Sequence, residues 1–136
     1  MYKKITFKNF SDGRGELIPI EIGSENFDIP FEVKRCYFIS FPTNENGAVR
    51  GKHAHKNLKQ VIVCLNGSFT LRLIDRFGNE ENIILKAKNT GILIENLIWR
   101  ELKNFSKNCV ILVFADHHYN AEDYIVDFKE FLNITD

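Results

Sequence analysis

The sequence predicts an all-β domain, a sandwich or barrel, with one short helix near the C-terminus. Short apolar segments rich in Val, Ile, Leu and Phe recur at roughly the spacing expected of antiparallel sandwiches and barrels. Turn residues separate these segments, and no linker, internal repeat or low-complexity tract divides the chain. A length of 136 residues suffices to bury a single core, so we expect one domain over residues 1–136.

Six segments carry the strand pattern most clearly. In chain order they are VKRCYFISF (33–41), KQVIVCLNG (59–67), SFTLRLID (68–75), ENIILKA (81–87), TGILIEN (90–96) and NCVILVFAD (108–116). Asn66-Gly67 predicts a type I′ hairpin between the second and third segments, and Phe77-Gly78-Asn79 predicts another turn. The N-terminal segment KKITFKNF (3–10) alternates polar and apolar residues and predicts a further strand.

One helix is predicted near the end of the chain. Asn120 is the candidate N-cap, and Glu122 and Asp123 would fill the first turn, where acidic side chains favour the helix dipole. The residues that follow the helical period are Ala121, Tyr124, Ile125, Phe128 and Phe131.

Composition and charge exclude several kinds of partner. Eighteen basic and eighteen acidic side chains cancel, so we expect no nucleic-acid partner. The N-terminus has no signal-peptide pattern, and the longest apolar run, Cys109–Ala115, is too short to span a bilayer, so we expect no membrane partner. Cys36, Cys64 and Cys109 each lie in an apolar strand-like segment. They predict reduced core thiols in a cytoplasmic protein.

Two histidines, His53 and His55, stand one residue apart in the segment GAVRGKHAHKNLKQVIVCLNG, residues 47–67. If this stretch is extended, both imidazoles enter the same space and Ala54 lies on the opposite face. Two imidazoles so close disfavour a double positive charge, which keeps at least one neutral and able to accept a proton. A metal site, a catalytic base and a surface pair without function are the alternatives, and the in-phase spacing favours function.

Five positions around these histidines have the spacing of the first cupin motif. They are Gly47, His53, His55, Gln60 and Gly67. A metal-binding cupin carries glutamate where this chain has Gln60, and a third histidine where this chain has Arg100. A stable divalent site usually takes three or more protein ligands, and an arginine beside it would repel the ion. The resemblance therefore implies a cupin jelly roll, and the departures from the motif predict a site without a metal or other cofactor.

Blocks along nearly the whole chain resemble the sugar 3,4-ketoisomerase family. They are DGRGELIPIE (12–21), IPFEVKRCYFI (29–39), RGKHAHKNLKQVIVCLNGSFTLRL (50–73), ENLIWRELKNFSKNCVILVFAD (95–116) and YNAEDYIVDFKEF (119–131). Those enzymes act on dTDP-4-keto-6-deoxy-D-glucose and feed the synthesis of 3-amino-3,6-dideoxyhexoses for bacterial surface glycans. The resemblance implies a metal-independent homodimer with swapped N-terminal strands. Arg14-Gly15 resembles the branch of the family whose product has the galacto configuration.

The same resemblance assigns roles to individual residues. Moving a ketone from C4 to C3 requires a neutral base for the C3 proton and hydrogen-bond donors for the enediolate oxygen. His53 matches the family's base, and His55 would hold a sugar hydroxyl or relay a proton. Tyr37 matches an active-site tyrosine that donates to the enolate oxygen, although a strand tyrosine that supports the core is an equal alternative.

Cations are needed for the diphosphate of the substrate. Arg50 and Arg14 are the first candidates, followed by Arg35, Lys52 and Arg100. Trp99, the single tryptophan, either lines the sugar pocket or fills the barrel, and the sequence does not separate these roles.

Two other functions stay open at this point. A dTDP-sugar 3,5-epimerase also uses a histidine base in a cupin barrel, but it pairs this base with an aspartate, and no His-x-Asp pattern surrounds His53. A non-catalytic sugar-binding cupin would need a partner domain to transmit a signal, and the sequence contains no DNA-binding segment. The isomerase is the leading hypothesis.

Overall fold

The computed structural model describes residues 1–43 and 47–135, and its regular structure is almost entirely strand. The strands are β1 (Tyr2–Thr6), β2 (Phe10–Asp12), β3 (Gly15–Leu17), β4 (Arg35–Phe41), β5 (Val49–His55), β6 (Gln60–Asn66), β7 (Phe69–Ile74), β8 (Glu80–Leu85), β9 (Thr90–Ile94), β10 (Trp99–Lys103), β11 (Cys109–Ala115) and β12 (Tyr124–Ile125). The helical elements are the 3-10 turn η1 (Ala121–Asp123) and the helix α1 (Phe128–Leu132). The predicted all-β class with a short C-terminal helix is confirmed.

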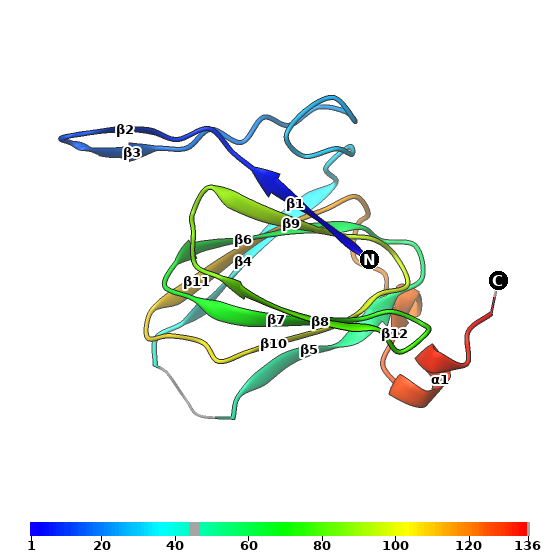
Figure 1. Ribbon diagram of the computed structural model, residues 1–136. Coiled ribbons are helices and arrows are strands. Elements are labelled where there is room, and N and C mark those ends of the chain that lie inside the picture. The colour runs from blue at the N-terminus through cyan, green and yellow to red at the C-terminus, as the bar shows by residue number, and fades with distance from the viewer. Residues whose placement is uncertain (44–46, 136) are drawn as a thin grey trace.

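Two five-stranded antiparallel sheets form the layers of a sandwich (Figure 1). One sheet has the order β1-β9-β6-β11-β4 and the other the order β12-β5-β10-β7-β8. Their facing sides bury a common apolar core that includes Ile62, Leu71 and Ile92. Because side chains alternate along a strand, every second residue enters this layer. The arrangement matches the cupin sandwich that the sequence predicted.

All six segments with the clearest strand pattern form strands, but one predicted turn is wrong. Gly78 has a φ of +85° in the loop between the paired strands β7 and β8, which confirms the turn predicted there. Asn66-Gly67 instead joins β6 to β7, and these strands belong to different sheets. The link crosses from one layer to the other, so it is not a hairpin. A local turn signal cannot tell these two geometries apart.

The predicted helix is also corrected. Asn120 does cap a helical turn, since its side chain accepts from the Glu122 N–H, but the turn ends at Asp123. Tyr124 and Ile125 then pair with His55 and Ala54 of β5, and α1 begins only after the N-cap Asp127. Sheet pairing with a distant strand therefore overrides the local helical period.

Both outer faces of the sandwich are partly covered. Ile29, Phe7 and partly buried residues of the segment 18–33 pack on the outer side of the first sheet. Phe131 of α1 packs with Trp99 and Ile125 on the outer side of the second sheet. The inner faces of the two sheets form the main core and, at one end of the sandwich, the lining of a pocket.

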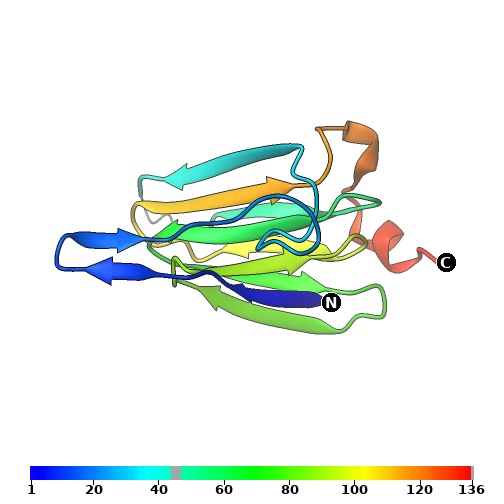
Figure 2. The ribbon, with the colours of Figure 1, turned by 90° about the horizontal axis from the view of Figure 1, so that it is seen from above.

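The N-terminal segment has two parts. β1 pairs with β9 of the same chain, from Tyr2 opposite Ile94 to Thr6 opposite Thr90. The hairpin β2–β3 extends away from the body of the sandwich in both ribbon views (Figures 1 and 2). Within this chain β1 completes the first sheet. The exchange of N-terminal strands between two subunits stays a prediction.

Two of the three cysteines lie where the sequence placed them. Cys64 and Cys109 are buried and unpaired, as expected for core thiols. Cys36 is exposed, because it lies on the outer face of the edge strand β4, so the prediction is wrong for this residue. Within residues 1–43 and 47–135, no helix has the length and apolar character needed to cross a membrane.

Candidate active site

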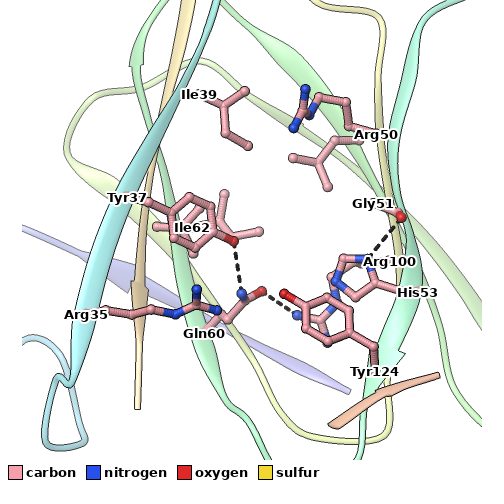
Figure 3. A pocket seen from close by; sticks show the side chains of 12 residues that line it. Arg35, Tyr37, Ile39, Arg50, Gly51, His53, Gln60, Ile62, Arg100 and Tyr124 are labelled. Carbon is pink, nitrogen blue, oxygen red and sulfur yellow. Dashed lines mark hydrogen bonds between the residues drawn. The ribbon is translucent and has the colours of Figure 1, made fainter. Parts of the chain in front are cut away.

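A pocket of about 270 Å³ opens between the two sheets and is lined by β4, β5, β6, β10, β11 and β12 (Figure 3). Three cations line it, namely Arg35, Arg50 and Arg100, together with His53. None of the described residues that line the pocket is Asp or Glu. The pocket therefore suits an anionic ligand.

A β-bulge in β5 points both Arg50 and His53 into this pocket. Arg50 pairs with Leu102 and His53 with Arg100, while the register between them shifts by one residue. In a regular strand residues 50 and 53 would face opposite sides, and the extra residue restores the same side. Gly51 and Lys52 make the bulge with φ values of +86° and +52°. A Cβ on Gly51 would lie 3.0 Å from the carbonyl oxygen of Arg100, so the position requires glycine.

The two histidines lie on the same inner face, as their spacing predicted. Their Nε2 atoms are 3.1 Å apart and their rings meet edge to face. Nδ1 of His53 lies 2.9 Å from the carbonyl oxygen of Gly51, and Nδ1 of His55 lies 2.9 Å from Oδ2 of Asp123. His53 lines the pocket, whereas His55 is fully buried behind it. Tyr124 contacts both imidazole rings.

The surroundings keep both histidines neutral at pH 7. Burial, and after it the Arg100 guanidinium, lowers the pKa of His53 from 6.5 to about 4. Burial, Arg100 and His53 lower the pKa of His55 well below its usual value, although Asp123 opposes them. Burial lowers the pKa of Arg100 itself to about 10, so this side chain remains a cation at neutral pH. His53 is therefore a neutral imidazole that faces the pocket.

Asp123 is a site residue that the sequence analysis missed. It lies 68 residues from His55 in the chain, and the local sequence pattern predicts it in the first turn of a helix. Its Oδ1 accepts from the Asn57 N–H at 2.8 Å, while Oδ2 faces His55. Burial acts to raise the pKa of Asp123, but the hydrogen bonds from Asn57 and His55 outweigh it, and the pKa falls below its usual value. Asp123 is therefore ionised.

A hydrogen-bonded chain of three side chains crosses the floor of the pocket (Figure 3). Nη1 of Arg100 donates to Oε1 of Gln60 at 2.6 Å, and Nε2 of Gln60 donates to the Tyr37 hydroxyl at 3.1 Å. The Tyr37 oxygen thus accepts from Gln60, which leaves its own proton to donate elsewhere. Burial raises the pKa of Tyr37, so the hydroxyl stays protonated. Tyr37 can consequently donate a hydrogen bond into the pocket, and the position where metal-binding cupins carry glutamate is neutral.

Arg35 lies at the pocket beside two aromatic rings. Its guanidinium is 5.4 Å from the centre of the Tyr37 ring and 5.8 Å from that of Tyr119. Nε of Arg35 and Nε of Arg100 are buried and have no hydrogen-bond partner within the described residues. Both atoms are donors that an anionic ligand can satisfy.

Three candidate substrate-binding residues lie outside this pocket. Trp99 points to the outer face of its sheet, where its ring packs against Phe128 and Phe131, because it neighbours the inward-facing Arg100. Lys52 is exposed in the bulge and does not line the pocket. Arg14 lies on the β2–β3 hairpin with a side chain that is 92% exposed and paired with Asp12. The structure therefore does not bring Trp99, Lys52 or Arg14 into the pocket of their own chain.

The donor set around the histidines does not resemble a metal centre. No group of three or more His, Cys, Asp or Glu side chains is placed to hold an ion in the described part of the chain. The amide oxygen of Gln60 accepts a hydrogen bond from the Arg100 cation at 2.6 Å, so an ion bound to this oxygen would lie beside a positive charge. These contacts suit an anion better than a divalent cation.

Comparisons with known proteins agree with the geometry of the pocket. The model of the FdtA family, described as "WxcM-like, C-terminal", matches residues 1–136. The chain is 42% identical over 130 residues to the TDP-4-oxo-6-deoxy-alpha-D-glucose-3,4-oxoisomerase of Aneurinibacillus thermoaerophilus. This match covers 95% of this chain and 88% of the relative.

Two solved structures share both fold and sequence. QdtA, a sugar 3,4-ketoisomerase from Thermoanaerobacterium thermosaccharolyticum solved with TDP, is 39% identical with a TM-score of 0.88. The match covers 97% of this chain and 92% of QdtA. WlaRB, the TDP-quinovose 3,4-ketoisomerase of Campylobacter jejuni, is 40% identical with a TM-score of 0.87, over 98% of each chain. Family match, sequence identity and fold agree over almost the full length, and the chain belongs to the WxcM-like FdtA family, among whose members are sugar-nucleotide 3,4-ketoisomerases.

Proposed function

We propose that this protein is an isomerase that converts dTDP-4-keto-6-deoxy-D-glucose into a dTDP-3-keto-6-deoxyhexose. The observation that carries the proposal is the neutral imidazole of His53, which faces a cationic pocket opposite the protonated hydroxyl of Tyr37. A base and a proton donor in one pocket are what enolisation next to a ketone requires. The names of the relatives support the same substrate class.

The reaction proceeds through an enediolate. His53 takes the proton from C3, and the electron pair of that C–H bond shifts toward the C4 carbonyl, where negative charge develops on O4. Tyr37 donates a hydrogen bond to O4, and the Arg100 cation stabilises the charge. A proton then returns to C4, O4 gains a proton and O3 loses one, so the product is an isomer of the substrate. His55 is fully buried behind His53, with the two Nε2 atoms 3.1 Å apart, so it acts on the reaction only through that base.

The diphosphate binds to the cations at the pocket. Arg35 and Arg50 line opposite sides of it (Figure 3), and neither forms an ion pair within the described residues. Arginine offers parallel donors to phosphate oxygens. The buried Nε of Arg35 gains a partner when the anion binds.

The protein acts as a homodimer in this proposal. The β2–β3 hairpin carries Phe10 and Leu17, which are 60% and 61% exposed, and a second subunit would cover them. Arg14 at the tip of the same hairpin would then reach the partner's pocket. Arg14 belongs to the block 12–21 that resembles the ketoisomerase family, yet it lies outside the pocket of its own chain. An exchange of N-terminal segments between two subunits explains both facts.

The galacto configuration at C4 is the product we propose, on the resemblance of Arg14-Gly15. The product would enter the cytoplasmic synthesis of 3-amino-3,6-dideoxyhexoses for surface glycans such as O-antigen. A gluco product is the second candidate, since the 40%-identical WlaRB is named for quinovose. The coupling between H4 and H5 of the product, measured by NMR in ordinary water, is small for the galacto and large for the gluco configuration.

Incubation with the keto sugar nucleotide in deuterium oxide tests the reaction. The isomerase should place deuterium at C4 of a 3-keto product. A 3,5-epimerase would exchange C3 and C5 and keep the ketone at C4, and a binding protein would exchange nothing. Either of these last results would overturn the proposed function.

A further inference from the structure

A row of three polar contacts runs behind the pocket, from Gly51 through the two histidines to Asp123. Both ends of the row are acceptors, because a carbonyl oxygen and an ionised carboxylate have no proton to give. The Gly51 oxygen lies 2.9 Å from Nδ1 of His53, and Oδ2 of Asp123 lies 2.9 Å from Nδ1 of His55. Each Nδ1 must therefore carry a proton and donate it outward along the row.

These two bonds fix the tautomers of both rings. A neutral imidazole has one N–H, so with Nδ1 protonated the Nε2 atom of each ring has a lone pair. The two Nε2 atoms lie 3.1 Å apart, at hydrogen-bond distance, but a neutral pair has no proton between them. The row therefore has a hydrogen bond at each end, but the contact between the two Nε2 atoms in its middle has no proton.

We infer that Asp123 is a positioning residue of the active site, which holds His55 in the Nδ1–H tautomer so that its Nε2 faces His53 as an acceptor. This inference rests on the proposed function for its catalytic consequence, while the tautomers themselves follow from the contacts. If His55 had the other tautomer, its Nε2–H would donate to His53 and occupy the lone pair that the base needs.

The arrangement favours the step in which the base is protonated. When His53 takes the C3 proton, its Nε2–H can donate to Nε2 of His55, and two facing lone pairs become a charge-assisted hydrogen bond. This bond is absent before proton transfer, so it stabilises the state after transfer more than the resting state. Asp123 balances the new positive charge through His55.

The groups around the pair allow one added proton and oppose a second. Arg100 on β10, Arg50 on β5 and Arg35 on β4 are cations that line the same pocket. Asp123 provides the anion nearest to the imidazoles, and Tyr37 and Tyr124 are hydroxyl-bearing neighbours. The pair therefore accepts the substrate's proton and stays below a double positive charge.

The substitution Asp123→Asn tests this inference. Oδ1 of the asparagine can keep the bond to the Asn57 N–H, which directs the amide N–H₂ group toward Nδ1 of His55. That nitrogen must then accept, so the His55 proton moves to Nε2 and hydrogen-bonds to the base. We expect kcat to fall on the order of 10²- to 10⁴-fold with KM nearly unchanged.

Asp116→Asn is the matched control. Asp116 also accepts a backbone N–H, from Lys59 at 2.8 Å, and contacts a histidine, His117, at 2.6 Å, but it lies outside the pocket. This variant should keep the kcat of the unchanged protein. Equal losses of kcat in both variants would show that Asp123 acts through stability alone, and would overturn the inference.

Nitrogen-15 NMR of histidine-labelled protein reads the tautomers without substrate. In the unchanged protein at pH 7, both His53 and His55 should show a protonated Nδ1 and a bare Nε2. In Asp123→Asn, His55 should show the reverse. A protonated Nε2 on His55 in the unchanged protein refutes the inference even if the variant does not fold. If the tautomers are as expected but the keto sugar is not turned over, the proposed function fails and the positioning role in tautomer control stands.

Discussion

Lowering the pH from 7 to 4 should destabilise this protein more than it destabilises a His53→Asn variant. His53 has a pKa of about 4 in the folded chain, against 6.5 for an unburied histidine. Because the folded pKa is the lower one, the unfolded chain takes up a proton first as the pH falls. The stability that neutral His53 contributes is thus fully present above pH 6.5 and is lost progressively down to pH 4.

The size of the effect follows from the two pKa values. Over the interval from 6.5 to about 4, each pH unit changes the unfolding free energy by about 1.4 kcal/mol. The loss at pH 4 is therefore about 3 kcal/mol for His53 alone. Asparagine has no proton to gain in this range, and its side-chain amide can still donate to the Gly51 oxygen that Nδ1 of His53 now faces.

Urea unfolding, followed by circular dichroism and by the fluorescence of the buried Trp99, measures this difference at pH 7, 5.5, 4.5 and 4. Carboxylates such as Glu80, whose pKa is lowered to about 2 by Arg72, titrate in both proteins and cancel in the comparison. His117→Asn, at an exposed histidine, should follow the unchanged protein. If the free energies of the unchanged protein and His53→Asn fall in parallel with pH, the burial argument for a neutral base is refuted.

Four further outcomes are expected. His53→Asn should lose on the order of 10²- to 10⁴-fold in turnover but still bind TDP by calorimetry, and more than a tenth of normal activity would assign the base elsewhere. In Gln60→Glu the new carboxylate should pair with Arg100 and accept the Tyr37 proton in a hydrogen bond, which directs this proton away from the substrate. We expect kcat to fall and the pKa of His53 to rise in an NMR titration. An unchanged kcat would contradict the donor role of Tyr37. Elemental analysis should find no stoichiometric divalent metal, and chelators should leave the rate unchanged; one ion per chain that activity requires would disprove this. The protein should be a dimer by light scattering at micromolar concentration, and deleting residues 1–10 should weaken this dimer and lower the activity. A truncated chain that stays dimeric and fully active would contradict the proposed exchange of N-terminal segments.

The sequence by itself determined the class of the fold and the centre of the site. Alternating apolar segments identified six strands of the sandwich, because alternation is a property of each strand alone. The same rule placed His53 and His55 on one face. The departure at Gln60 from the metal-binding motif was visible without coordinates, as was the cation at position 100. These features are local in the chain, and a local pattern suffices to predict them.

Features that depend on which strands meet were decided only by the tertiary structure. The bulge at Gly51 and Lys52, which turns Arg50 to the side of His53, exists because β5 pairs with β10 in a shifted register. Trp99 faces outward because the strand that contains it turns Arg100 inward.

The segment after Asn120 shows the same limit most clearly. Its local pattern favours a helix, yet Tyr124 and Ile125 form a strand beside His55, and this pairing brings Asp123 to the imidazole. Asp123 and His55 lie 68 residues apart in the chain, so no window of local sequence contains both sides of their contact. The energy of sheet pairing and apolar burial exceeds a local helical preference of a few tenths of a kcal/mol per residue, which is why the tertiary structure and not the local pattern fixed this part of the site.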